Sequence, residues 1–380
     1  MKVLMTADTV GGVWTYAIEL IRALPDIEFI LATMGRKANG NQRGEVPPNA
    51  KLIESEYKLE WQDEPWEDVT RAGDWLLDLE ATERPDLIHL NGYAHGALPF
   101  RAPKLIVGHS CVVSWWCAVK DEDAPREWDI YREHVERGLA CADLVAAPSA
   151  WMLGALHEHY RFDARSRLIY NGRTFEAPSV EREKTVFAAG RMWDEAKNLR
   201  AVVEAAPMID APIRIAGDGG EQSANVQHLG RLDESDMRRA FASSSIYLFP
   251  ALYEPFGLSI LEAANAGCAL VIGDIPSLRE IWGDAALFVK PRRPREIARA
   301  VNEVLATDEL REELARRAKQ RAAQYTPQRM ADGYRGTYEA LKAVPRGSSG
   351  SSEFLGRAVA PPEELRGTPR NRGTEEPNPA

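Results

Sequence analysis

The chain has 380 residues and a formal net charge of −10, and 44% of its residues are hydrophobic. This length predicts two domains, each with its own core. Since no stretch of the sequence is strongly basic, the composition argues against a nucleic-acid-binding protein and against a basic face that docks on anionic lipid.

The apolar runs and the cysteines bear on the compartment. No apolar run approaches the ~20 residues of a transmembrane helix. The start, MKVLMTADTV, is too short and too polar for a signal peptide and is expected to form a strand. The four cysteines, Cys111, Cys117, Cys141 and Cys268, form no CxxC pair. We therefore expect reduced thiols in a cytoplasmic protein without a transmembrane segment.

Two adjacent glycines follow the first predicted strand. Lys2 to Thr6 is that strand, and Trp14 to Leu24 has the periodicity of an amphipathic helix. Gly11 and Gly12 lie in the loop between them, at the sheet edge where open α/β proteins bind ligands. Glycines let a backbone approach a ligand closely, although the same pair also suits a plain tight turn. The loop lacks the GxGxxG spacing of dinucleotide-binding proteins.

Strands and helices alternate through the rest of the first half. Further strands are expected at Glu28 to Thr33, Asp86 to Leu90, Lys104 to Val107, Leu144 to Ala147 and Arg167 to Tyr170, and helices at about Trp66 to Thr82 and Glu127 to Cys141. The polar segment from Arg36 to Pro48 is expected to be a mobile loop. His109 follows a buried strand at the ligand-binding edge, so it is either a ligand-binding residue or a core histidine. His95 is expected at the surface.

Two cations flank a strand-to-helix turn early in the second half. Thr185 to Ala189 is the predicted strand, and Arg191 and Lys197 follow it. Such a pair can neutralise a diphosphate without a metal ion, although isolated surface cations are common. Gly217 ends the next predicted strand, Ile213 to Ala216.

The most informative stretch runs from Ser245 to Asp284. It predicts a strand at Ile246 to Phe249, a helix that starts at Gly257, and a second strand at Ala269 to Ile272. Together these elements make one βαβ unit. The start of such a helix presents free N–H groups and the positive end of its dipole to an anionic ligand.

Two glutamates in this unit can face the same ligand. Glu254 lies in the loop after the strand, and Glu262 lies one to two turns into the helix. Either carboxylate alone would be interpreted as a solvated surface charge. Their spacing, with Pro-Phe-Gly-Leu after the first, favours a shared site for a ligand with two sets of hydroxyls.

The run EPFGLSILEAANAGCALVIGD resembles the donor-site motif of the family 4 glycosyltransferases, which are retaining enzymes of the GT-B fold. The resemblance implies that Glu254 contacts hydroxyls of the transferred sugar and that Glu262 holds the ribose of the nucleotide. It also implies that the backbone of Phe256, Gly257 and Leu258 lies against the sugar and the diphosphate.

Other positions match the family in the same way. Arg191 and Lys197 match an arginine and a lysine that bind the donor diphosphate. Gly11 and Gly12 match a Gly-Gly loop near the donor phosphates and the acceptor. His109 matches a histidine near the transferred sugar, which would give it a role in positioning that sugar.

Two further matches lie near the nucleotide, and one segment departs from the family. Gly217 matches a glycine turn close to the nucleotide, and the backbone near Leu232 is expected beside the base. After the last strand of the first half the family usually has Asn-Gly-Val-Asp, whereas this chain has Asn-Gly-Arg-Thr at residues 171–174. A role for that aspartate therefore does not carry over.

The resemblance implies two Rossmann-like domains whose parallel sheets face each other across an interdomain cleft. The expected boundaries are 1–173 for the acceptor-side domain, 184–325 for the nucleotide-sugar-binding domain and 326–342 for a final helix. That helix is expected to return to the first domain, where Tyr334 and Tyr338 pack. Residues 346–380 have little apolar content and are expected to be disordered.

The implied activity is transfer of a sugar, with retention, from a nucleotide sugar to a hydroxyl of a saccharide, lipid-linked or small-molecule acceptor. No Asp-x-Asp occurs in a suitable context, so neither a metal ion nor a cofactor beyond the donor is expected. Trp115 and Trp116 either shape the acceptor pocket or fill a core. Two alternatives stay open: a GT-B protein that binds a nucleotide sugar without catalysis, and an NAD-dependent enzyme, which the missing GxGxxG disfavours.

Overall fold

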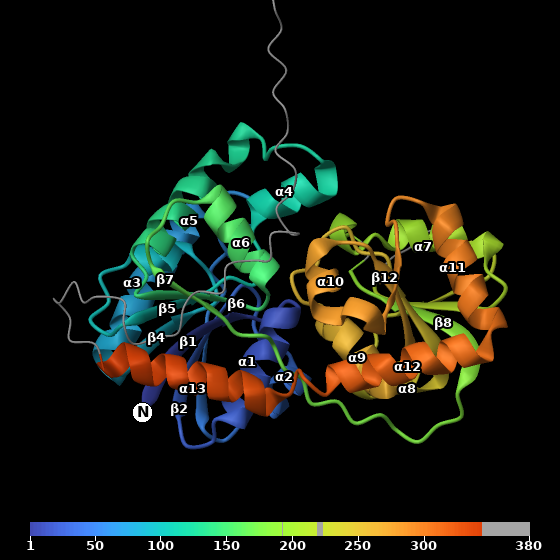
Figure 1. Cartoon of the computed structure of the whole chain (residues 1–380). Helices are drawn as coiled ribbons and strands as arrows, with labels where there is room; N and C mark the ends of the chain where they lie inside the picture. Colours follow the sequence, from blue (N-terminus) through green and yellow to red (C-terminus); the bar gives the residue numbers. More distant parts are fainter. Residues whose placement is uncertain (192, 219–222, 344–380) are drawn as a thin grey trace, which may run out of the picture.

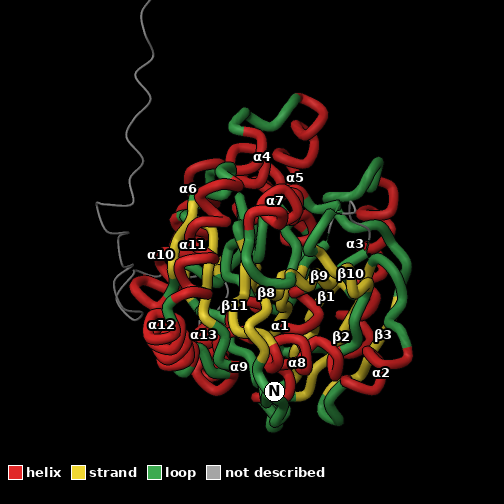
Figure 2. The backbone as a smooth tube through the Cα atoms, turned by 90° about the vertical axis from the view of Figure 1, so that its right-hand side faces the viewer, coloured by secondary structure: helices red, strands yellow, loops and turns green. Residues whose placement is uncertain are grey.

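The computed structural model of the chain describes residues 1–191, 193–218 and 223–343. Two parallel sheets form two domains that lie side by side, and helices cover each sheet (Figure 1). Figure 2, turned by 90°, shows the strands inside and the helices around them. The predicted class, α/β with two Rossmann-like domains, is confirmed. Within the described ranges, no helix is both long enough and apolar enough to cross a lipid bilayer.

The N-terminal sheet has seven strands in the order β3-β2-β1-β4-β5-β6-β7. Its strands are β1 (Lys2–Asp8), β2 (Glu28–Met34), β3 (Ala50–Glu54), β4 (Leu87–Leu90), β5 (Lys104–Val107), β6 (Leu144–Ala147) and β7 (Arg165–Leu168). The helices of this half are α1 (Gly12–Ala23), α2 (Gly40–Glu45), α3 (Trp66–Glu83), α4 (Val112–Lys120), α5 (Asp129–Ala140) and α6 (Ala150–His159), with 3₁₀ turns η1 (Ala94–Ala97) and η2 (Arg126–Trp128).

The C-terminal sheet has six strands in the order β10-β9-β8-β11-β12-β13. Its strands are β8 (Glu183–Ala189), β9 (Ile213–Ala216), β10 (Val226–Gly230), β11 (Ser244–Phe249), β12 (Ala269–Gly273) and β13 (Leu287–Val289). The helices are α7 (Leu199–Ala205), α8 (Glu234–Ser243), α9 (Leu258–Ala266), α10 (Pro276–Trp282), α11 (Pro294–Ala306), α12 (Asp308–Ala322) and α13 (Pro327–Ala343), with 3₁₀ turns η3 (Glu195–Lys197), η4 (Ala206–Met208) and η5 (Gly283–Ala285).

The strand order of each sheet reverses once, and this reversal decides where a ligand can bind. In the first sheet the chain leaves β1 toward β2 and β3 and later returns to β4 on the other side. In the second sheet it does the same around β8, with β11 on the other side. The loops after such strands diverge to opposite faces and leave a crevice at the carboxyl edge. Gly11, Arg191 and Glu254 follow β1, β8 and β11, which are strands at a reversal, whereas His109, Gly217 and Leu232 follow β5, β9 and β10.

The chain crosses between the domains twice, and the two crossings touch. The first crossing follows β7, and the second leads from α12 into α13, which lies along the N-terminal domain (Figure 1). Tyr334 and Tyr338 of α13 are fully buried in the core of the first domain. The Tyr338 hydroxyl lies 2.7 Å from Nδ1 of the buried His89 on β4. At the crossing itself, a Cβ on Gly172 would lie 2.2 Å from the backbone oxygen of Thr326.

Gly172→Ala is therefore expected to destabilise the protein, because a backbone atom of the second crossing must move to admit the methyl group. We expect a loss of about 1–3 kcal/mol, as for other overpacked sites, measured as a lower midpoint in urea. Gly154→Ala on α6 is the matched control, since nothing lies within 4 Å of its Cβ position. It should hold or raise stability, because alanine favours a helix. Equal stability of the two variants would contradict the tight crossing.

Several local predictions in the first half were wrong. The segment predicted as a mobile loop contains α2, whose N-cap Asn39 and Gln42 form a reciprocal capping box. The edge strand β3 was missed because its short sequence is only partly buried. His95, expected at the surface, is buried and its Nε2 lies 3.0 Å from the Val69 carbonyl oxygen. The expected disorder of residues 346–380 lies outside the described residues.

Candidate active site

A cleft of about 720 Å³ lies between the two domains at the carboxyl edges of the sheets. The first domain contributes Gly11 and residues of α1 and α2 to its walls, and the second contributes Leu232, Glu262 and residues of α8. Three residues predicted from the sequence therefore line one cavity, although they come from distant parts of the chain.

Lys197 and Glu254 form an ion pair within the second domain. Lys197 Nζ lies 2.8 Å from Glu254 Oε2, and both side chains are largely buried. The position of Lys197 is fixed by the next residue, Asn198, whose amide donates to the carbonyl oxygens of Pro250 and Pro291. The Glu254 carbonyl accepts from the Ser277 hydroxyl at 2.6 Å. The turn after β8 and the loop after β11 thus bring one cation and one carboxylate into contact.

Arg191 reaches the glycine loop of the other domain. A Cβ on Gly11 would lie 3.0 Å from Arg191 Nη1, and Gly11 has a φ of 103°, which favours glycine. A Cβ on Gly12 would lie 3.7 Å from Cδ1 of Leu258. Arg191 Nη2 also bonds Asp194 at 2.8 Å, and its guanidinium carbon lies 4.9 Å from the centre of the exposed Trp193 ring. The structure therefore brings Gly11, Gly12, Arg191 and Leu258 together across the cleft.

The start of α9 has the geometry of an anion site. Gly257 is its N-cap with a φ of 91°, and no side chain caps this end. The N–H groups of the first turn and the helix dipole suit the negative charge of a phosphate. Phe256, in contrast, points away from the cleft, because its buried ring packs in the core against Tyr325 at 5.6 Å between ring centres. Only the backbone of Phe256 can therefore serve a ligand.

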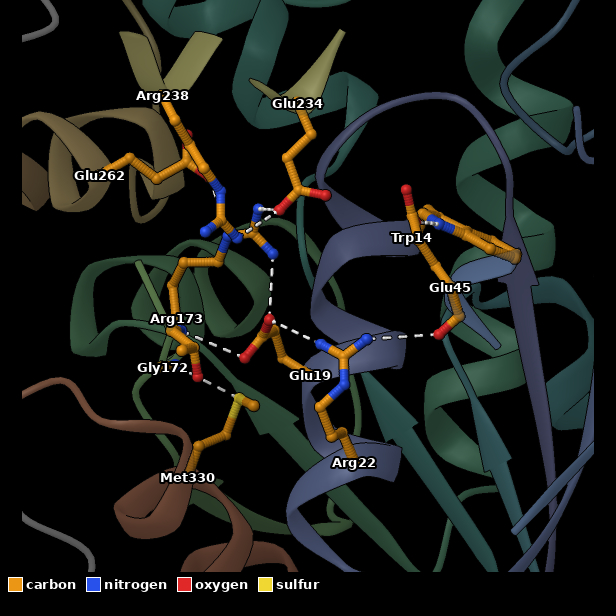
Figure 3. Close-up of polar contacts among 11 residues, drawn as sticks. Trp14, Glu19, Arg22, Glu45, Gly172, Arg173, Glu234, Arg238, Glu262 and Met330 are labelled. Carbon is orange, nitrogen blue, oxygen red and sulfur yellow. Dashed lines mark hydrogen bonds and ion pairs between the residues drawn. The ribbon is translucent and has the colours of Figure 1, made fainter. Parts of the chain in front are cut away.

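Glu262 is buried and paired with an arginine that the sequence did not single out. Arg173 Nε donates to Glu262 Oε1 at 2.8 Å (Figure 3). Burial raises the pKa of the Glu262 carboxyl, and the charge and hydrogen bond of Arg173 oppose that rise. Arg173 stands where the family usually has valine, so the departure from the Asn-Gly-Val-Asp pattern was the signal that could have found it.

His109 and Gly217 stand apart from these residues. His109 Nε2 lies 2.8 Å from Asn91 Oδ1, and its ring meets the Tyr16 ring edge-on at 4.5 Å. Burial lowers the pKa of His109 to about 3, so its imidazole is neutral at physiological pH. Gly217, with a φ of 146°, donates its N–H to the Gly230 carbonyl. Its neighbours 219–222 lie outside the described residues. Of the predicted site residues, the described lining of the cleft contains Gly11, Leu232 and Glu262, and it does not contain Gly12, His109, Arg191, Lys197, Gly217, Glu254, Phe256, Gly257 or Leu258.

Asp8 is a candidate that sequence reasoning missed. It ends β1 at the same edge as Gly11, and it accepts the Val10 N–H at 2.7 Å. Burial raises the pKa of Asp8 to about 6, against the opposing effects of the Val10 N–H and of the charges of Arg191 and Arg36. A carboxyl poised near neutral pH at a cleft is a common property of functional sites. The feature of the sequence that could have identified Asp8 is its position at the end of the first strand.

A second set of contacts, separate from those of the glycine loop, holds the two domains together. The Glu280 carboxylate of α10 accepts the N–H groups of Ala150 and Trp151, at 2.7 and 2.9 Å, and so caps α6 of the other domain. The Tyr253 hydroxyl lies within 3.2 Å of Ser110, Cys111 and Ser114. Glu280 therefore has a structural partner.

The two tryptophans of α4 lie next to this interface. The Trp115 and Trp116 rings are 5.8 Å apart, and the Lys120 ammonium lies 5.8 Å from each. Lys120 also bonds Glu195 of the second domain at 2.7 Å. Among the described residues, no group of three or more His, Cys, Asp or Glu side chains has the arrangement of a metal site.

Comparisons with known proteins identify the family that the chain resembles. The family model for glycosyl transferases group 1 matches residues 173–321, and that for glycosyltransferase family 4 matches residues 10–176. An O-antigen chain mannosyltransferase B of Escherichia coli is 31% identical over 107 residues, which cover 28% of each chain. A phosphatidyl-myo-inositol mannosyltransferase of Mycolicibacterium smegmatis is 29% identical over 159 residues, covering 37% of this chain and 41% of the relative. These curated relatives are thus matched over less than half of their length.

Solved structures resemble the whole fold at low sequence identity. Sucrose-phosphate synthase from Thermosynechococcus elongatus has a TM-score of 0.76 at 18% identity, over 90% of this chain and 99% of that one. HepE of Anabaena, in complex with UDP and glucose, has a TM-score of 0.70 at 17% identity, over 90% and 100% of the two chains. WaaG, a glycosyltransferase of lipopolysaccharide biosynthesis, has a TM-score of 0.69 at 12% identity. The likenesses support the predicted GT-B arrangement of the two domains.

Proposed function

The chain belongs to the family 4 glycosyltransferases, and we propose that it transfers a sugar from a nucleotide sugar to an acceptor hydroxyl with retention and without a metal ion. The observation that supports the proposal is that groups of both domains meet in and around the cleft: Glu262 and Gly11 line it, Arg191 reaches the Gly11 loop, and Lys197 pairs with Glu254. In the proposed site Arg191, Lys197 and the start of α9 supply positive potential, and Glu254 and Glu262 supply hydrogen-bond acceptors. This combination suits a ligand with a diphosphate between two sets of hydroxyls.

The reaction follows from these roles. The bond between the anomeric carbon and the diphosphate breaks, and a bond from the acceptor oxygen to the same carbon forms on the same face. The acceptor proton passes to the departing phosphate oxygen, so no enzymatic base is needed, and because the acceptor attacks on the same face directly, no enzymatic nucleophile is needed either. Arg191 and Lys197 stabilise the charge that grows on the diphosphate. Glu254, held by Lys197, accepts hydrogen bonds from the sugar, and Glu262 accepts them from the ribose.

The partners proposed for the enzyme follow from the same site. The donor is a nucleotide hexose, in keeping with the UDP and glucose bound by HepE and with the mannosyltransferases among the relatives. The acceptor is a saccharide, a lipid-linked sugar or a small molecule, and no cofactor or nucleic acid takes part. A cytoplasmic location is also proposed, since all four cysteines are free thiols.

Two measurements test the proposal. Melting temperatures are recorded with UDP-, GDP-, ADP- and TDP-sugars, because a ligand that binds the native state raises the melting temperature. The best donor is then incubated with candidate acceptors in EDTA, and the product anomer is determined. Transfer with retention in EDTA is expected. An inverted product, or activity lost in EDTA and restored by Mg²⁺, would contradict the mechanism.

The alternative function is a protein that binds a nucleotide sugar and transfers nothing. The presence in this chain of all four charged residues, Arg191, Lys197, Glu254 and Glu262, argues against it. It would be favoured if a donor raised the melting temperature and no sugar were released, either to an acceptor or to water.

A further inference from the structure

A single guanidinium, that of Arg173, joins carboxylates from both domains at the end of the cleft. Arg173 Nε bonds Glu262 of α9 at 2.8 Å, and Nη1 bonds Glu19 of α1 at 3.0 Å. Its Nη2 lies 3.4 Å from Glu234 of α8. Figure 3 shows Arg173 between these three carboxylates, one from the first domain and two from the second.

The central groups of this cluster are buried, so their charges depend on one another. The side-chain exposure is 12% for Arg173, 2% for Glu19 and 15% for Glu262. A buried carboxylate that loses its partner keeps the cost of desolvation without the compensating attraction, so it tends to take up a proton. Glu262 has few other compensating groups.

The other charged neighbours of Glu262 act on its pKa in opposite directions. On α8, Glu234 raises the pKa of Glu262 and Arg238 lowers it. Arg238 and Glu234 also bond each other at 2.7 Å. On α1, Arg22 pairs with Glu19 at 3.3 Å, and Tyr247 of β11 lies on the remaining side as a neutral phenol. Among these neighbours, Arg173 most strongly opposes the rise in the pKa of Glu262 that burial causes.

The backbone fixes where this guanidinium can be. The Arg173 N–H donates to the Tyr325 carbonyl, and the preceding Gly172 N–H meets the Met330 sulfur at 3.3 Å. Thr174 N–H donates to the second oxygen of Glu19 at 3.1 Å. Arg173 thus sits at the place where the chain crosses between the domains, and its link to Glu19 depends on how the domains lie.

We propose that Arg173 is a positioning residue for the nucleotide, which holds the Glu262 carboxylate charged and in place while it ties that carboxylate to α1 of the opposite domain. The inference rests on the proposed function, in which Glu262 accepts hydrogen bonds from the ribose. Within the described part of the chain Arg173 engages Oε1 of Glu262, which leaves Oε2 for a ribose hydroxyl.

The test measures the affinity for UDP, GDP, ADP and TDP by calorimetry as a function of pH. In the Arg173→Met variant the Glu262 carboxyl is expected to bind a proton near neutral pH, so the affinity relative to wild type falls about tenfold between about pH 8.5 and pH 6. The ratio of the variant's affinity to the wild-type affinity is compared at each pH, because the terminal phosphate of the nucleotide titrates in the same range. Arg173→Lys keeps the positive charge. We expect it to bind the nucleotide more weakly than wild type, with an affinity ratio that does not change with pH.

A double variant assigns the pH dependence to its source. Arg173→Met combined with Glu262→Gln should bind weakly at every pH, since position 262 no longer carries a carboxylate that can titrate. Arg335→Met, which removes a surface pair with Asp26 outside the cleft, serves as the control for loss of an arginine and should match wild type. Circular dichroism establishes that each variant is folded.

The outcomes separate this inference from the proposed function. A flat ratio for Arg173→Met, or a pH dependence that survives in the double variant, would overturn the role of Arg173 while leaving the proposed function intact. If Arg173→Met does not fold, the role of Arg173 is overturned instead by an affinity ratio of Arg173→Lys to wild type that changes with pH. Wild-type protein that binds none of UDP, GDP, ADP and TDP would overturn the proposed function, and with it this inference.

Discussion

Replacing Lys197 with alanine is expected to lower kcat by about 100-fold or more, because it removes a positive charge directed at the leaving diphosphate. The ammonium lies 2.8 Å from Glu254, so the substitution also frees the carboxylate that is proposed to hold the sugar. Both changes act on the chemical step more than on the binding of the nucleoside. We therefore expect kcat to fall much further than KM rises.

Steady-state kinetics with the best donor and acceptor measures this effect. Lys184→Ala is the matched control, since Lys184 pairs with Asp308 at 2.8 Å on the exposed surface. An exposed ion pair of this kind contributes little to stability. Because it also takes no part in the cleft, the Lys184→Ala variant should keep wild-type turnover. Turnover of Lys197→Ala close to that of the control would remove Lys197 from the diphosphate site.

The fold of the central βαβ unit was predicted well because its signals are local. The apolar strand, the glycine turn and the helix spacing around Gly257 lie within a few tens of residues, and the structure has β11, α9 and β12 there. The weaker predictions depended on tertiary contacts. A short edge strand such as β3 is specified by its pairing with β2, which the local sequence does not reveal.

The site residues, like the fold, were predicted where the signal is local and missed where it depends on tertiary contacts. The position of a residue after a strand was enough to place Gly11, Arg191 and Glu254 at the carboxyl edges. Which side chains contact each other could not be predicted from the sequence. The Lys197–Glu254 ion pair, for example, joins two turns that are far apart in the chain. Arg173 was visible only as a departure from a pattern, since its three carboxylate partners lie on α1, α8 and α9.

Gly11→Ala is expected to lower turnover by about 100-fold, the size of effect that a displacement of about 1 Å in a catalytic group can have. The added methyl would lie 3.0 Å from Arg191 Nη1, so either the guanidinium or the loop must move. Gly11 also has a φ of 103°, which is strained for alanine by about 1–3 kcal/mol. The expected result is a protein that is somewhat less stable and much less active.

Gly267→Ala separates these two effects. Gly267 has a φ of 84°, and its Cβ position lies 3.2 Å from an arginine nitrogen, that of Arg182, but it stands at the opposite end of α9 from the cleft. Its alanine variant should lose a similar amount of stability and keep its turnover. If both variants lost turnover to the same extent, backbone strain alone would explain Gly11. If neither lost it, the contact between the glycine loop and Arg191 would have no part in the reaction.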